Sequence, residues 1–126
     1  MAGGDPWRKA PADQVERFHE AVAGIDGVEV RKMFGYPAAF IGGNLTAGLH
    51  QESVMVRLPD AERQERLADG WTLFEPMPVR PMREYVALPP EVAADVVALR
   101  HWIERAAVHV RTLPPKAAKP RKGGAR

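Results

Sequence analysis

Four histidines and their acidic neighbours are the residues of this sequence that could ligate a metal or move a proton. His101 and Glu104 lie three positions apart in a segment of helical periodicity, and His50 precedes Glu52 by two positions. A metal site needs three or four converging ligands held by a supporting shell, and the spacing indicates no third ligand for either pair. The other two histidines fall on predicted helix surfaces: His19 and His109. We therefore predict no metal and no other cofactor.

Residue types that serve as nucleophiles are scarce. The only serine, Ser53, lies in a predicted turn without the strand–turn–helix context of a nucleophile elbow. The chain has no cysteine, which excludes thiol catalysis and disulfides. The carboxylates of Glu62 and Glu65 lie in a short charged segment typical of a solvated helix, and Gly42-Gly43 is not followed by the Gly-Lys-Ser/Thr of a phosphate-binding loop. We therefore predict that this protein is not an enzyme.

The first regular element expected along the chain is a helix from Pro11 to about Ala23. Its apolar residues have the spacing of one helical face: Val15, Phe18, Val22 and Ile25. Pro11 suits the start of a helix, and Asp13 with Glu16 three positions later resembles a capping pair. Gly24 suits its end.

From Val28 to Leu58 the apolar pattern alternates with a period of two, which is typical of strands. Gly35 and Pro37 predict a bend or bulge between two strand segments, and Gly42-Gly43-Asn44 predicts a tight hairpin turn. A further tight turn is expected near Gln51-Glu52. These turns predict an antiparallel meander.

In the second half of the chain we expect a helix, two strands and a final helix. A short charged helix is expected over Ala61–Ala68, a strand over Trp71–Phe74, a stiff loop over Pro76–Pro81 and a strand over Met82–Leu88. Pro89-Pro90 then begins the longest helix, whose apolar stripe steps by four, three, four, three and four: Val92, Val96, Leu99, Ile103, Ala106 and Val110.

The order of these elements, α-β-β-β-β-α-β-β-α, predicts a two-layer α+β domain in which helices cover one face of an antiparallel sheet. The second face of such a sheet can remain exposed to water. Alternation predicts the strand residues that face the helices: Val28, Val30, Leu45, Leu49, Val54, Val56, Val86 and Leu88. Six aromatic residues are expected in the core or at its edge: Phe18, Phe34, Phe40, Trp71, Phe74 and Trp102.

The face turned away from the helices is the candidate binding surface. It is predicted to present arginine, methionine and tyrosine side chains, which are enriched at the centres of protein interfaces: Arg31, Met33, Met55, Arg57, Arg83 and Tyr85. We interpret this face as a surface for a protein partner or for self-association. The alternative is that acidic neighbours such as Glu29 and Glu84 neutralise the arginines, or that a loop covers them. Binding of single-stranded nucleic acid is disfavoured because the face has few aromatic residues for base stacking.

Charge is concentrated at the end of this 126-residue chain, whose length fits one domain. Residues 114–126 carry five basic side chains and no acidic one, which leaves 13 basic and 16 acidic side chains in residues 1–113, a net charge of −3. We expect residues 1–10 to form a flexible leader, residues 11–113 to fold, and residues 114–126 to be a disordered basic tail. The tail could contact nucleic-acid phosphates without reading sequence, through Lys116, Lys119, Arg121, Lys122 and Arg126.

The segment Arg31–Asn44, RKMFGYPAAFIGGN, resembles the N-terminal domain of the TfoX/Sxy family, named after regulators of bacterial competence. The similarity continues to the last helix with its Trp102 and covers about Val28–Val110, with Lys32–Gly35 as its most distinctive part. The resemblance implies an α+β fold like that of type III secretion chaperones, a non-enzymatic regulatory role, and no catalytic residues. Within Lys32–Gly35 we expect Phe34 to pack inside and Gly35 to permit the bend.

These observations predict a cytoplasmic protein that works by binding another protein or itself. The longest apolar run, four residues, is far shorter than the about 20 that a membrane span needs. The alternative is a nucleic-acid-associated accessory protein that uses the basic tail for nonspecific contacts.

Overall fold

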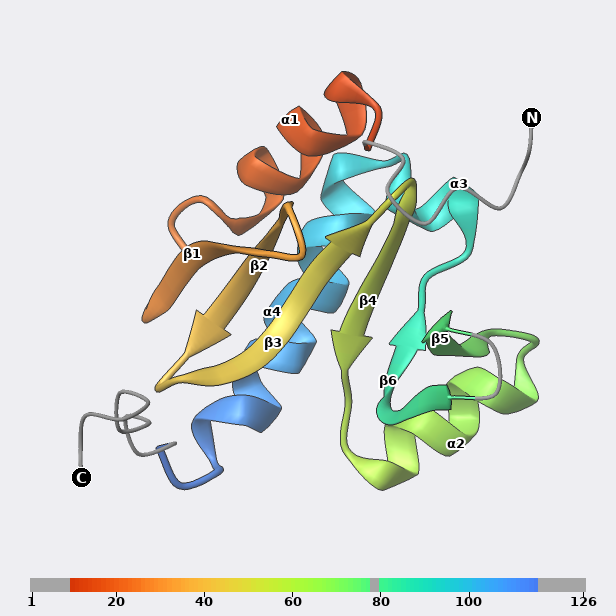
Figure 1. Cartoon of the computed structure of the whole chain (residues 1–126). Helices are drawn as coiled ribbons and strands as arrows, with labels where there is room; N and C mark the ends of the chain where they lie inside the picture. Colours follow the sequence, from red (N-terminus) through yellow and green to blue (C-terminus); the bar gives the residue numbers. More distant parts are fainter. Residues whose placement is uncertain (1–9, 78–79, 116–126) are drawn as a thin grey trace.

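The computed structural model describes residues 10–77 and 80–115 (Figure 1). In chain order the elements are α1 (Ala12–Val22), β1 (Val28–Met33), β2 (Tyr36–Ile41), β3 (Asn44–His50), β4 (Ser53–Arg57), α2 (Asp60–Ala68), β5 (Thr72–Met77), β6 (Arg80–Ala87), α3 (Pro90–Ala93) and α4 (Val96–Arg111). This arrangement confirms the predicted α+β fold. The predicted basic tail and almost all of the predicted leader, residues 116–126 and 1–9, lie outside the described residues.

The strands of the described residues form one antiparallel sheet with the order β1-β2-β3-β4-β6-β5. Strands β1 to β4 are the predicted meander, with turns at Phe34-Gly35, Gly42-Gly43 and Gln51-Glu52. The chain then leaves the sheet through α2 and returns as the β5–β6 pair, so that β6 lies beside β4 and β5 forms an outer edge. The opposite edge is β1.

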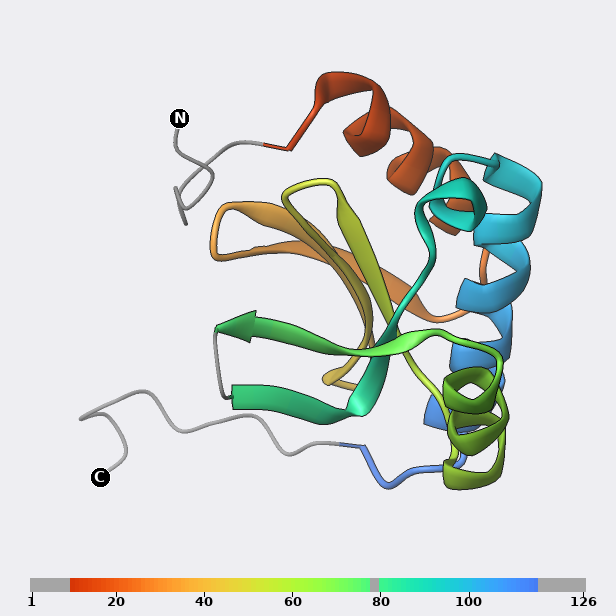
Figure 2. The same ribbon diagram turned by 90° about the vertical axis from the view of Figure 1, so that its right-hand side faces the viewer.

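The core lies between the sheet and the helices. Strand residues such as Leu49, Val56 and Val86 are fully or almost fully buried against α4 residues such as Leu99 and Ile103, as the alternation and the helical stripe predicted. Helix α1 packs against α4 and adds Phe18 and its neighbours to the same cluster. Helix α2 buries none of its residues fully, which agrees with its charged sequence. The described helices lie on one side of the sheet and leave its other face uncovered (Figure 2).

Two predictions about helix ends are corrected by the structure. Asp13 makes no capping hydrogen bond at α1 and instead lies 3.6 Å from Arg17, one turn later. The predicted long helix from Pro90 is divided into α3 and α4. At the break, the Asp95 carboxylate accepts a hydrogen bond from the Val97 backbone N–H at 3.0 Å, as an N-cap does. The apolar stripe continues across this break because both segments pack on the same core.

The proline-rich loop is shorter than predicted. Strand β5 extends to Met77 and therefore includes Pro76, and β6 begins at Arg80. The β5–β6 pairing is irregular at two places, which accommodates residues without a backbone N–H donor. Pro37, expected at a bend, lies inside β2, and the bend is the preceding turn. No helix among residues 10–77 and 80–115 has the length and apolarity of a membrane span.

Candidate interaction surface

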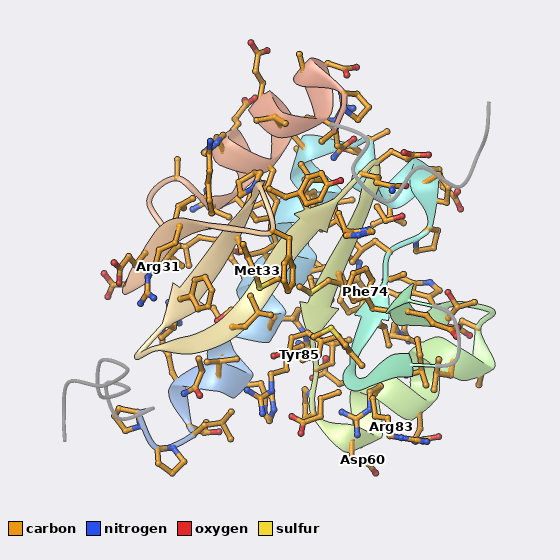
Figure 3. All side chains as sticks on the ribbon, in the orientation of Figure 1. Arg31, Met33, Asp60, Phe74, Arg83 and Tyr85 are labelled. Atoms are coloured by element: carbon orange, nitrogen blue, oxygen red, sulfur yellow. The ribbon has the colours of Figure 1, made fainter. Side chains whose placement is uncertain are left out.

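Five of the six predicted binding residues lie on the face of the sheet opposite the core. Arg31 of β1 aligns through Ala38 and Gly48 with Met55 of β4, and Arg57 pairs with Tyr85 of β6. Figure 3 shows Met33 and Tyr85 over the middle of this face, with Arg31 and Arg83 at opposite margins. By strand register Arg31, Met33, Met55, Arg57 and Tyr85 share this face, whereas the register shift between β5 and β6 breaks the alternation at Arg83.

Met55 is a correction to the predicted surface, because its side chain is only 1% exposed. It packs over Gly48, where an added Cβ would lie 2.7 Å from the Met55 Cε atom. Figure 2 shows the physical reason: the sheet curls, so that the β1–β2 turn and the ends of β5 and β6 project away from α4. Residues near the bottom of this concave face are enclosed by the sheet itself.

Aromatic side chains close the concave face beside Met55. The ring centroids of Tyr36 and His50 are 5.2 Å apart, and those of His50 and Phe74 are 5.8 Å apart. Tyr36 and Phe74 are buried, and burial lowers the pKa of His50 more than the nearby Glu52 raises it. This second cluster was not predicted, although Tyr36 lies at the position of β2 that alternates with the core residues Ala39 and Ile41. The face away from the helices therefore also buries aromatic side chains, of which Tyr36 belongs to the main core cluster.

Arg57 and Tyr85 are held by contacts within the chain. Arg57 Nε donates to Glu84 Oε1 at 2.8 Å, its guanidinium lies 5.8 Å from the Tyr85 ring centre, and its side chain is 18% exposed. Tyr85 Oη donates to the Leu45 carbonyl oxygen at 3.1 Å, and burial raises the pKa of Tyr85. Neutralisation of Arg57 by Glu84 is the alternative that the sequence analysis left open.

The turn between β1 and β2 is the most exposed apolar feature of the described chain. Phe34 is 77% exposed, so the expectation that it packs inside is wrong. Phe34 and Gly35 have φ of 57° and 86°, the left-handed backbone that a two-residue hairpin turn requires. A turn that projects from the sheet directs the residue at its tip into solvent. Lys32 and Met33 end β1, so only Phe34 and Gly35 of the distinctive segment form the tip, with a positive φ that is costly for phenylalanine.

Strand β1 leads to this turn and remains exposed along its length. Four of its six residues are exposed and the two at its ends are half-buried. Val30, expected to face the helices, lies on that side of the sheet but is 38% exposed, because β1 extends past the helical layer. Arg31 lies over the Phe40 ring at 4.7 Å and is 3.3 Å from the Glu29 carboxylate.

A second surface feature is a shallow cleft of about 290 Å³ between α2 and the C-terminal half of α4. Its rim includes Glu62, Arg105, Val108 and His109, and Arg105 binds the Glu62 carboxylate through two hydrogen bonds of 3.2 and 2.6 Å. Burial, followed by the positive charge of Arg57, lowers the pKa of His109. No three histidine or acidic side chains of the described residues lie close enough to hold a metal ion. The charged side chains at this cleft, Glu62 and Arg105, thus bind each other instead of forming a site for a metal ion.

The family model of the TfoX N-terminal domain matches residues 20–110. The chain belongs to the TfoX N-terminal domain family. Within this TfoX N-terminal domain the matched segment begins near the end of α1 and ends in α4, so it contains the complete sheet, the Phe34 turn and the exposed β1 strand. No curated protein and no solved structure matches the chain.

Proposed function

We propose that this TfoX N-terminal domain is a non-enzymatic interaction module, and that it binds a protein partner or a second copy through the β1–β2 hairpin. The proposal depends on one observation: Phe34, a large apolar residue, is 77% exposed at the tip of that hairpin. Aromatic residues of this kind supply much of the binding energy at protein interfaces, because their burial removes a large apolar area from water.

The backbone at Phe34 supports this proposal. Its φ of 57° is a conformation in which an L-residue with a large side chain is strained by about 1–2 kcal/mol, whereas asparagine or glycine is tolerated. The fold would be more stable with asparagine at this position. A phenylalanine that neither packs in the core nor suits its turn is therefore expected to serve a contact outside the chain.

The other prominent residues of the hairpin suit the same role. Met33, next to the tip, is half-buried on the face away from the helices, and Arg31 lies two residues earlier at the edge. Methionine adapts its shape to varied partners, and arginine can bind carboxylates through two parallel hydrogen bonds. Arg57 and Tyr85 have a secondary role in our proposal, because their polar groups already bind Glu84 and the Leu45 carbonyl within the chain.

The test compares full-length Phe34→Asn with Val108→Asn, a matched control in which another exposed apolar residue (62%) is changed on α4. Each variant and the parent protein are used for affinity capture from extract of the source cell and for sedimentation analysis. We expect Phe34→Asn to lose the captured protein or the self-association that the parent shows, and Val108→Asn to retain it. Equal retention by both variants would contradict a binding role for the hairpin.

A further inference from the structure

No strand of residues 10–77 and 80–115 pairs with the outer edge of β1, which therefore presents backbone hydrogen-bonding groups. In an antiparallel pair, alternate residues direct their N–H and C=O groups toward the neighbouring strand. The pair that flanks a two-residue turn, Met33 with Tyr36, is a hydrogen-bonded pair, so Arg31 and Glu29 also face β2. The groups of Val30 and Lys32 therefore point away from the sheet, ready to pair with another strand.

The two edges of the sheet differ in their suitability for such pairing. Strand β5 contains Pro76, which has no N–H donor, and its register shifts at two places. Strand β1 is regular over its six residues, with no register shift against β2, and has no proline. Exposed regular edges are usually blocked by bulges, prolines or inward-pointing charges. At the centre of β1, the residue on the helix side of the sheet is instead an exposed valine, Val30.

We propose that two copies of this chain associate by antiparallel pairing of their β1 strands about a two-fold axis at Val30, with Glu29 of each copy opposite Arg31 of the other. This inference rests on the proposed function and specifies its partner as a second copy. The two sheets would join into one continuous sheet, and the exposed valines would meet at its centre.

The register follows from hydrogen bonding and charge. Outward-facing residues must lie opposite outward-facing residues, which permits symmetric pairings centred on a residue and excludes those shifted by one position. A centre at Glu29 would place two glutamates opposite each other, and a centre at Arg31 would do the same with two arginines. Only the centre at Val30 places opposite charges face to face, and it does so twice because of the symmetry.

The charges that favour this pairing also restrict other associations. Glu29 and Arg31 already lie 3.3 Å apart on one face of β1, with most of their side-chain surface exposed. In the proposed pair, each would gain a second partner across the axis, which gives a network of four charges. A neutral strand offered by an unrelated protein would not supply these partners, so the same residues would favour a second copy over chance pairing.

The experiment measures the dissociation constant of the full chain by sedimentation over a concentration series. Glu29→Arg places like charges opposite each other twice, and Arg31→Glu does the same with the opposite sign. We expect each single variant to weaken the dimer about tenfold or more. The double variant that exchanges both charges restores the opposite pairs and should recover most of the parent affinity.

Two controls keep the test specific. Glu104→Arg replaces an exposed ion pair with Arg100 on α4 by two like charges, and it should leave the dimer unchanged. Urea unfolding of each variant confirms that the fold is retained, as expected for exposed ion pairs that contribute little to stability. Val30→Pro, which removes an outward N–H without removing a bond to β2, should also prevent association.

The outcomes separate this inference from the function on which it rests. A parent protein that stays monomeric, or a dimer insensitive to the charges of Glu29 and Arg31, would overturn the β1 pairing. Capture of a different protein that depends on Phe34 would then leave the proposed function standing. If the parent protein did not self-associate and its capture of other proteins did not depend on Phe34, both the β1 pairing and the proposed function would be overturned.

Discussion

Tyr85 Oη donates a hydrogen bond to the Leu45 carbonyl oxygen at 3.1 Å, and so connects β6 to β3 across the end of β4. Strand β4 ends at Arg57, which pairs with Tyr85 in register, and the chain then turns into α2. The tyrosine therefore bridges the two halves of the sheet at the point where the meander stops. Its position explains why a residue of the predicted open face is half-buried.

Replacement of Tyr85 by phenylalanine should remove this hydrogen bond and keep the ring. The Leu45 carbonyl loses its partner, so we expect the free energy of unfolding to fall by about 1 kcal/mol. Urea unfolding of both proteins measures the difference. Equal stability would mean that solvent satisfies the carbonyl and that the bridge contributes nothing.

Tyr85 should also make the fold sensitive to alkali. Burial raises its pKa above the ordinary value of 10.0, so the folded state favours the neutral phenol. This contribution is present below pH 10 and is lost as the pH rises through the pKa of the folded state. The tyrosinate absorbance should show one late titration that disappears in Tyr85→Phe. The absence from the parent protein of any late titration that Tyr85→Phe lacks would contradict the burial of Tyr85.

The stability of the fold should decrease in mild acid because of His50. Burial between Tyr36 and Phe74 holds its pKa below 6.5, so the neutral ring is favoured in the folded protein. This stability is present above pH 6.5 and is lost as the pH falls through the lower pKa of the folded state. NMR titration should give His50 a lower pKa than in the unfolded chain. His50→Phe should flatten the dependence of the unfolding free energy on pH, although His109 keeps a part of it.

Gly48→Ala should be destabilising because of Met55. The added Cβ would lie 2.7 Å from Met55 Cε, so the end of this buried, flexible side chain would have to shift. We expect a loss of about 1–3 kcal/mol. In a Met55→Ala background the same substitution should cost much less, and urea unfolding of the four proteins measures this coupling. Additive effects would show that the two residues do not compete for space.

Phe34→Asn should stabilise the isolated protein by about 1 kcal/mol, because asparagine tolerates the positive φ of the turn. The matched comparison is Phe18→Ala in α1, where a fully buried ring is removed and a loss of about 3–5 kcal/mol is expected. Thermal and urea unfolding give both values. If Phe34→Asn were destabilising by as much as a core substitution, the ring would have to pack against the protein.

Much of the fold was predictable because its signals are local. Pro11 begins a helix, alternating residues form strands, and the stripe of α4 follows from helical periodicity. The turn at Gly42-Gly43 was predictable because glycine tolerates the positive φ that the turn imposes. Alternation predicted one face for the six surface residues, but alternation reports neither how far the sheet curls nor where the β5–β6 register shifts beside Arg83.

The differences between prediction and structure have tertiary causes. Met55 is buried because the curled sheet and Gly48 enclose it, and Phe34 is exposed because the hairpin projects from the sheet. Arg57 was predicted to bind a partner or to be neutralised by Glu84, and the structure shows that Glu84 binds it from the neighbouring strand. None of these relations follows from the spacing of residues within one element.

The sequence by itself determined the kinds of elements and their order, since these depend on periods of 2 and 3.6 residues along the chain. The bulge between β2 and β3, which turns Leu45 to the face of Phe40, did not follow from the period. Only the tertiary structure decided that β1 is the regular free edge and that β6 lies between β4 and β5. Strand order and sheet curvature depend on pairing between residues far apart in the chain. The same pairing decides which side chains remain accessible to a partner.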